Sequence, residues 1–419
     1  GNRPDYQRAK EWEKNNKPKI SISKFKNGDR VLRKKQNINY AEFTKAKSVQ
    51  SENNHETFDQ THFEIIYNSL DPNKIWTLKS SGRVVEEVIY DYARNLTHES
   101  YLHSFIINDI DAETKSLFFE EEWQEIFNVE VNDKPKLKSS IKDLLKNCSV
   151  DDPKKLRKIL YESFLSDDFD LEFINYAYQG MMFLWNKDEN PFDHSKLEGW
   201  YEVNVWGRLI DPAFDNLLNI DLVRGEGMSL ASSDRKNFKR SLDTRKKVGR
   251  KGDGVFRLHK DRLEFGIIEA GRKWEGQAGS KYLSDSLKAS KMLKDMLCQL
   301  VSECDMKESL SRKLQAVGIL HGANRIQIIT ADLPEGYITR IRRRKIQEVT
   351  GRLTVSNPLA LVLKEILYAK TIISQTVDVI SKKYLDIEKV LDSDDEYDML
   401  PVIELVETFA TPRPSETCV

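Results

Sequence analysis

The run Leu263–Ala270 constrains the fold of this chain more than any other segment. It is apolar at most positions on both faces, which is typical of a strand inside a sheet. The preceding run, Gly252–His259, alternates in the manner of a strand, and the polar residues Lys260–Arg262 separate the two. We therefore expect a hairpin in the interior of an α/β sheet.

Two carboxylates lie on this hairpin, Asp253 and Glu269. If His259 pairs with Leu263 across a three-residue loop, Asp253 lies opposite Glu269, and directly opposed residues share a face. A two-residue loop would turn Glu269 to the other side. Two carboxylates at neighbouring strand ends suit Mg²⁺ or Mn²⁺, and such an ion activates water beside a phosphate.

Each acid also has a structural interpretation. Asp253 could be an exposed strand residue of the common kind. Glu269 closes a run that would be buried on both faces, and ionisable side chains are rarely buried without a partner. Burial therefore favours a functional role for Glu269.

The next segment, Lys281–Leu300, predicts an amphipathic helix. Lys288 lies on a face beside the apolar stripe, together with Lys281 and Asp285. In phosphodiester hydrolysis an ammonium would orient the attacking water or stabilise the charged transition state. The alternative is a solvated lysine on a helix surface.

Upstream, Lys196–Ile210 predicts a helix that ends at Asp211 and Pro212. Glu202 lies on its inward-packing face, with Val205 and Leu209. It could be a further metal ligand or a base, and it could equally be the polar edge of an amphipathic helix.

Downstream, the runs Leu314–Leu320 and Arg325–Ile329 predict two strands joined by a turn, and Tyr337–Ile346 predicts another. A helix from about Leu359 to Lys383 should close the core. Basic side chains on one face of the Tyr337–Ile346 strand could hold phosphates, without reading sequence. They could also be the charges that protect a solvated edge strand. These side chains are Arg340, Arg342 and Arg344.

With these motifs in place, the segment from about Gly199 to Val349 resembles the PD-(D/E)XK nuclease superfamily, and more closely its divergent members abundant in early-diverging fungi. In that superfamily an Asp and a Glu hold a divalent ion, and a lysine two residues after the Glu assists the water. Asp253 and Glu269 match the two acids, and Glu202 matches the helix glutamate of some members. The resemblance implies a restriction-endonuclease-like core, which is a mixed sheet flanked by helices. It also implies Mg²⁺- or Mn²⁺-dependent hydrolysis of nucleic acid, with DNA favoured over RNA as the substrate.

The sequence departs from the superfamily at one position, since Gly271 stands where the motif has its lysine. Lys273 or Lys288 could supply the amine instead. Two hypotheses therefore stand. The first is an active metal-dependent nuclease, and the second is a nuclease-fold module that binds nucleic acid or protein without cutting it.

Composition limits the partners. Lys and Arg number 66 against 67 Asp and Glu, so any nucleic-acid site must be local. We expect a flexible polar arm at 1–60, a helical accessory domain at 61–190, the nuclease core at 191–385 and an acidic tail at 386–419. The accessory domain could position substrate, recruit a protein partner or block the cleft.

The segment Arg224–Arg240 is glycine-rich and then basic, which favours a long flexible connection. Alternatively, Arg235 and Lys236 within it clamp a phosphate. The sequence has no apolar run of membrane-spanning length and no signal peptide, so we expect an intracellular protein of the nucleus or cytoplasm that binds no membrane. It does not indicate an oligomeric state.

Overall fold

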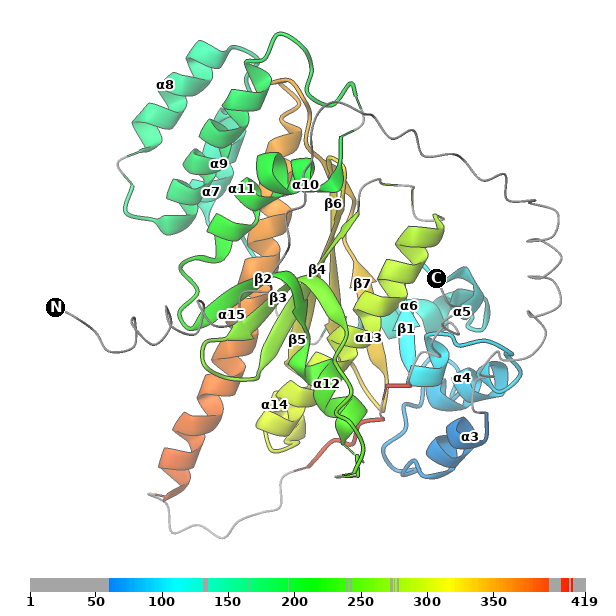
Figure 1. Ribbon diagram of the computed structural model, residues 1–419. Coiled ribbons are helices and arrows are strands. Elements are labelled where there is room, and N and C mark those ends of the chain that lie inside the picture. The colour runs from blue at the N-terminus through cyan, green and yellow to red at the C-terminus, as the bar shows by residue number, and fades with distance from the viewer. Residues whose placement is uncertain are drawn as a thin grey trace, which may run out of the picture. The chain divides into compact units, whose positions relative to one another are not determined.

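Most of the chain from residue 60 onward is described by the computed structural model (Figure 1). The described residues are 60–130, 135–164, 166–194, 196–238, 240–241, 243–271, 274, 276, 279–391, 401–406 and 408–409, with backbone alone at 226, 280–281 and 383–391. Lys273, nearly all of the expected arm at 1–60 and most of the expected tail at 386–419 lie outside these residues.

The described chain is built around one eight-stranded mixed sheet, as the α/β prediction required. The strand order is β1-β7-β6-β5-β4-β3-β2, and β8 pairs with β6. Strands β4 and β5 are parallel, as are β1 and β7, and the other neighbours are antiparallel. The strands are β1 (Ile106–Asn108), β2 (Ile220–Met228), β3 (Lys251–Leu258), β4 (Glu264–Gly271), β5 (Gln315–Gly322), β6 (Arg325–Asp332), β7 (Thr339–Arg343) and β8 (Gln347–Glu348).

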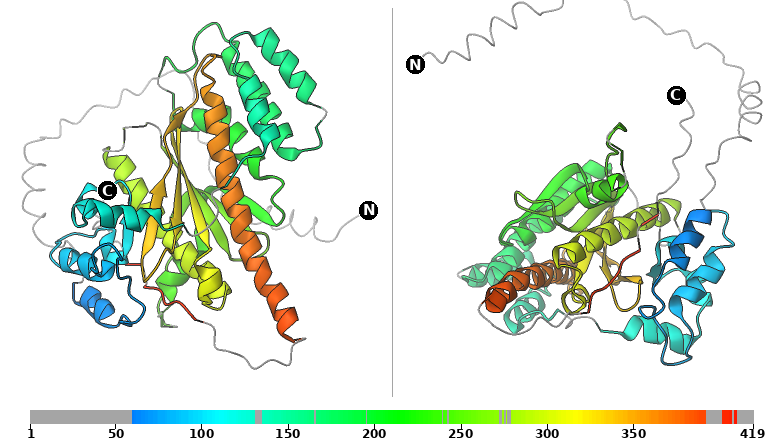
Figure 2. Two further views of the ribbon diagram at one scale, coloured as in Figure 1. Left: turned by 180° about the vertical axis from the view of Figure 1, so that it is seen from behind. Right: turned by 90° about the horizontal axis from the view of Figure 1, so that it is seen from below.

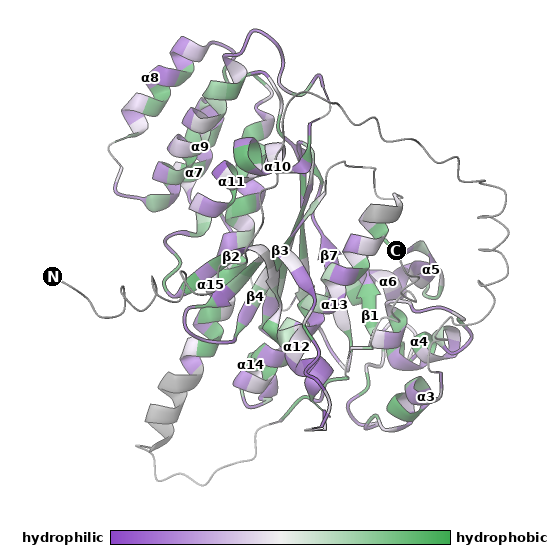
Figure 3. Ribbon diagram, in the orientation of Figure 1, coloured by the Kyte–Doolittle hydropathy of each residue, from purple (hydrophilic) through white to green (hydrophobic). Residues whose placement is uncertain are grey.

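Two long helices cover opposite faces of this sheet, α13 (Ser280–Glu303) and α15 (Pro358–Leu391) (Figures 1 and 2). Helix α13 connects the parallel strands β4 and β5, because parallel neighbours need a crossover. The expected hairpin between Leu314 and Ile329 is confirmed as β5–β6. Hydrophobic side chains of the strands and of both helices form one large buried core, and the outer helices mix hydrophilic and hydrophobic residues (Figure 3).

The region expected as one accessory domain, 61–190, forms two separate groups. Segments 60–128 have their own hydrophobic cluster and supply β1 to the main sheet. Helices at 139–185 instead pack against the main core. The first group contains α3 (Gln60–Asn68), α4 (Val85–Ala93), η1 (Leu102–Ser104), α5 (Ala112–Ser116) and α6 (Glu120–Asn128), and the second contains α7 (Ser139–Asn147), α8 (Pro153–Ser163) and α9 (Phe169–Trp185).

The remaining short helices lie before β2, between β2 and β3, and between α13 and β5. The expected helix at 196–210 is divided, because its middle section winds as a π-helix. The segments are α10 (Glu198–Tyr201), η2 (Glu202–Trp206), α11 (Gly207–Leu209), η3 (Asp211–Phe214), α12 (Leu230–Asn237) and α14 (Glu308–Ser311).

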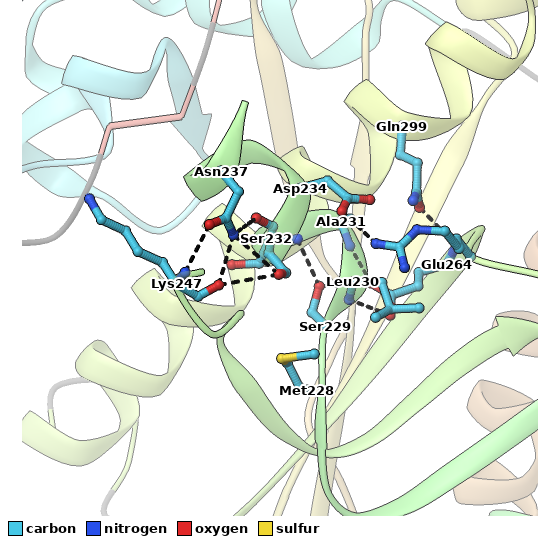
Figure 4. Close-up of polar contacts among 12 residues, drawn as sticks. Met228, Ser229, Leu230, Ala231, Ser232, Asp234, Asn237, Lys247, Glu264 and Gln299 are labelled. Carbon is cyan, nitrogen blue, oxygen red and sulfur yellow. Dashed lines mark hydrogen bonds and ion pairs between the residues drawn. The ribbon is translucent and has the colours of Figure 1, made fainter. Parts of the chain in front are cut away.

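Residues 224–237 are largely regular secondary structure, so the expectation of a long flexible connection is wrong for this part of the segment. It contains the end of β2 and helix α12, and the buried carboxylate of Glu264 holds the start of that helix (Figure 4). Glu264 accepts hydrogen bonds from the Ser229 hydroxyl at 2.7 Å and from the backbone N–H groups of Leu230 and Ala231 at 2.8 and 3.1 Å. Arg257, on the neighbouring strand, pairs with the same carboxylate at 2.8 Å. An internal anion therefore occupies the helix start, where a phosphate would otherwise be favoured.

Candidate active site

Asp253 and Glu269 lie next to the last pair of the β3–β4 ladder, Gly254 and Ile268. Continued by one residue, this register would set the two acids opposite each other on one face of the sheet. The charge of Asp253 raises the pKa of Glu269, so the two carboxylates are near each other. The Asp253 carboxylate also accepts the backbone N–H of Ala270 at 2.6 Å, which fixes it at the end of β4.

Glu269 is a buried acid with spare capacity to bind. Its side chain is 6% exposed, and its Oε1 has no hydrogen-bond partner among the described residues. Burial raises the pKa of Glu269 to about 7, against the lowering effect of Lys288, and the charges of Asp253 and Asp285 raise it further. A buried acceptor without a donor is costly, so this oxygen is suited to a cation.

The space beside that oxygen is kept open by a glycine. A Cβ at Gly252 would lie 3.4 Å from Oε1 of Glu269 and 3.4 Å from the backbone oxygen of Ile268. A larger side chain here would fill the space next to the free oxygen.

Lys288 places an amine beside Glu269. Its Nζ donates a hydrogen bond to Oε2 of Glu269 at 2.8 Å, from helix α13 rather than from β4. The Lys288 side chain is 33% exposed, so the ammonium reaches both the buried carboxylate and solvent. An ammonium has three donors, and two remain for a phosphate oxygen or a water.

A network of buried charges extends from this point along α13. The Arg250 guanidinium lies near Asp295 and Glu269, and burial lowers its pKa against the attraction of Asp295. Asp295 pairs with Arg235 at 2.8 Å. The buried Lys291 pairs with Glu99, and burial lowers its pKa to about 7. Beyond Lys288, this side of α13 is therefore polar and buried at Lys291 and Asp295, so a purely solvated face does not describe it.

The donor set fits a hard divalent cation with few protein ligands. Asp253 and Glu269 offer carboxylate oxygens near each other at the ends of β3 and β4, and Oε1 of Glu269 has no hydrogen-bond partner among the described residues. No group of three or more His, Cys, Asp or Glu side chains arranged for a metal occurs in the described part of the chain. Mg²⁺ commonly keeps several waters and takes one or two carboxylates plus substrate phosphates, so two acids suffice.

Glu202 is separated from this pair by the sheet. It lies 3.1 Å from Nε2 of His321 and 3.8 Å from Arg224. His321 pairs with Ala270, one residue along from Glu269, so its side chain points to the opposite face. Burial tends to raise the pKa of Glu202, but the His321 contact and the Arg224 charge outweigh it, and its pKa is lowered. The structure therefore places Glu202 in an ion-pair cluster away from the acid pair, where it cannot share their cation.

The three expected phosphate-binding arginines, two in β7 and Arg344 directly after it, differ in their surroundings. Arg340 is fully buried and forms two hydrogen bonds with Asp332, at 2.9 and 2.8 Å, so it is an internal residue. Arg344 pairs with Glu365 and stacks over Tyr368. Arg342 is a quarter exposed and lines a cavity.

Arg235 and Lys236 are also engaged internally. Arg235 contacts Asp295 and donates to the backbone oxygen of Thr408 at 3.0 Å. Lys236 donates to the backbone oxygen of Val248 at 3.0 Å. These contacts engage both side chains within the protein, at the positions for which a phosphate clamp was the alternative prediction.

Three residues with clear roles in the structure were not predicted from the sequence. Gly252 and Arg250 approach Glu269, and Glu264 holds the start of α12. The role of Glu264 could have been predicted, because it lies in the same strand as Glu269. That strand is buried on both faces, so a carboxylate within it needs polar partners. Arg250 and Gly252 lie just before or at the start of β3, and only the fold shows that they approach Glu269.

Comparisons of the chain with protein families, with curated proteins and with solved structures found no match. Among the described residues, no helix is both long and apolar enough to cross a membrane.

Proposed function

We propose that this protein is a divalent-metal-dependent nuclease of restriction-endonuclease-like architecture that hydrolyses phosphodiester bonds of nucleic acid. We favour DNA over RNA as its substrate. The observation that carries the proposal is the meeting of three groups from three elements. Asp253 from β3, Glu269 from β4 and the ammonium of Lys288 from α13 come together at one end of the sheet. The PD-(D/E)XK motif that the sequence resembles has two acids and an amine in this order.

Each group has a defined task. Asp253 and Glu269 would hold Mg²⁺ or Mn²⁺, which when bound activates water and neutralises charge on the phosphate. Lys288 holds Oε2 of Glu269 by its hydrogen bond, which leaves Oε1 for the ion. The remaining donors of the ammonium stabilise negative charge that develops on the phosphate oxygens.

Gly271 stands where the motif has its lysine, and Lys288 from helix α13 offers an amine in its place. Without an amine within reach of Glu269, a binding module without hydrolysis would be favoured. The 2.8 Å contact favours the active enzyme.

The test is cleavage of plasmid DNA, single-stranded DNA and RNA in Mg²⁺, in Mn²⁺ and in EDTA. The wild-type protein is expected to cut with either metal and not in EDTA. Asp253→Asn and Glu269→Gln should each lower the rate at least about 100-fold, and Lys288→Met about 10- to 100-fold, in line with losses for single charge-stabilising groups.

The matched control is Asp261→Asn, which removes one carboxylate from the exposed turn at the other end of the same hairpin. It should cut like the wild type. Cleavage that survives Glu269→Gln would remove this site from the mechanism. A folded wild type that binds nucleic acid and never cuts it would establish the binding module instead.

A further inference from the structure

A cavity of about 780 Å³ lies between α7, the end of β7 and the start of α15. This volume is in the range of about 300–1,000 Å³ that holds small ligands. Of its seventeen lining residues, seven are Lys or Arg. Among the described residues that line it, none is Asp or Glu.

Much of this positive charge has no ion-pair partner among the residues that the structure describes. Arg343 and Arg344 are neutralised by Asp109 and Glu365. The exposed lysines of the cavity wall make no ion pair with the described residues. These lysines are Lys136, Lys142, Lys146 and Lys364.

Arg342 adds a cation that the protein leaves incompletely bonded. Its buried Nε has no hydrogen-bond partner among the described residues, although its Nη2 donates to the backbone oxygen of Val129 at 2.7 Å. Burial lowers the pKa of Arg342, against the charges of Asp332, which lies at 4.0 Å, and of Glu130. An unpaired donor beside gathered like charges is stabilised when an anion enters.

We propose that this cavity binds a compact anion with two or more phosphate groups, such as the polyphosphate chain of a nucleotide. The cations come from three separate elements and surround a hollow, whereas a nucleic-acid backbone would need an extended stripe. Helix α15 begins at Pro358, directly after the lining residues Ser356 and Asn357, and a helix N-terminus favours negative charge. Apolar walls from Leu137, Leu145 and Leu361 give room for the uncharged part of such a ligand.

This site is distinct from the acid pair. Arg343 donates to the Tyr282 hydroxyl on α13 at 3.2 Å, whereas Arg344 contacts Glu365 on α15. Alternate residues of β7 therefore point to opposite faces, and Arg342 shares the α15 face. Glu269 contacts α13 on the other face. Ligand binding here needs neither metal nor cleavage, so it can be measured when both are absent.

The test is isothermal titration calorimetry with tripolyphosphate, with ATP and with a 12-nucleotide single-stranded DNA, in metal-free buffer containing EDTA. The variant Lys142→Gln, Lys146→Gln, Lys364→Gln removes three exposed charges of the cavity. Its matched control is Lys154→Gln, Lys155→Gln on the exposed face of α8, outside the cavity wall. Circular dichroism checks that every variant is folded.

Tripolyphosphate should bind the wild type saturably, and the triple variant should bind it at least tenfold more weakly, since each phosphate contact adds severalfold. The control and Glu269→Gln should bind within twofold of the wild type. Tighter binding of ATP would identify a nucleotide, and equal binding would identify the phosphate chain alone. The proposal is overturned if tripolyphosphate and ATP do not bind, if the triple variant binds like the wild type, or if only the oligonucleotide binds.

Discussion

The pKa of Glu269 leads to a stability prediction that separates an active site from a structural ion pair. Burial raises this pKa from its ordinary value of 4.5 to about 7 in the folded chain. The folded state therefore holds a proton that the unfolded state has released, and the free energy of unfolding falls as pH rises from about 4.5 to 7. A difference of this size corresponds to about 3 kcal/mol.

Glu269→Gln removes this penalty because glutamine stays neutral. In EDTA at pH 8 the variant should be more stable than the wild type by about 3 kcal/mol, and at pH 5 the difference should fall below about 1 kcal/mol. Urea unfolding followed by circular dichroism at both pH values measures this. Asp261→Asn serves as the control and should show no such pH dependence.

A divalent ion should raise the stability of the wild type at pH 8 relative to that of Glu269→Gln. Mg²⁺ at about 100 times its dissociation constant stabilises a protein that binds it when folded by about 2.7 kcal/mol. The wild type should gain this stability at pH 8, and Glu269→Gln should not. If Glu269→Gln is less stable than the wild type at pH 8 in EDTA, the carboxylate is a structural partner of Lys288 and the reasoning fails.

Three further predictions concern other parts of the fold. Glu202→Gln should retain cleavage within about twofold, because the sheet separates Glu202 from the acid pair, and a nuclease assay checks this. Glu264→Gln should lower the free energy of unfolding by about 3–5 kcal/mol in urea, because Arg257 and the start of α12 lose a buried charged partner. Gly336→Ala should cost more than about 2 kcal/mol, because Gly336 has φ of 56° and a Cβ there would lie 2.1 Å from Oε1 of Glu86; a shift in urea midpoint measures it.

The sequence predicted a register for the two acids, but its assumption about the turn was incomplete. Near the turn, Leu258 bonds to Leu263, a register that would place Asp253 opposite Ile268 and on the other face from Glu269. An irregularity between Phe256 and Arg257 shifts the ladder by one residue, so that Gly254 pairs with Ile268 and the ladder runs towards the predicted register. Periodicity shows that strands exist, but a bulge depends on tertiary packing that a local pattern does not encode.

The contact of Lys288 was predictable only as one of two options, because it depends on how α13 docks on the sheet. Residue type and spacing placed Lys288 on a candidate face, and the 2.8 Å distance follows from packing. The arginines of β7 and its end show a second limit of prediction from sequence. Their shared face was predicted, but the acids that neutralise Arg340 and Arg344 come from β6 and α15, and nothing local to β7 announces them.

The helix origin of the amine has a consequence for how the protein would respond to heat. In a protein whose acid and lysine stand two residues apart on one strand, the pair separates only when that strand is lost. Here Lys288 belongs to a 24-residue helix that is held to the sheet by side-chain packing, for example where Leu293 closes over Gly318. A loosening of that docking would take the ammonium away from Glu269 while the strands stay paired, so thermal inactivation should set in below the temperature at which the sheet itself melts.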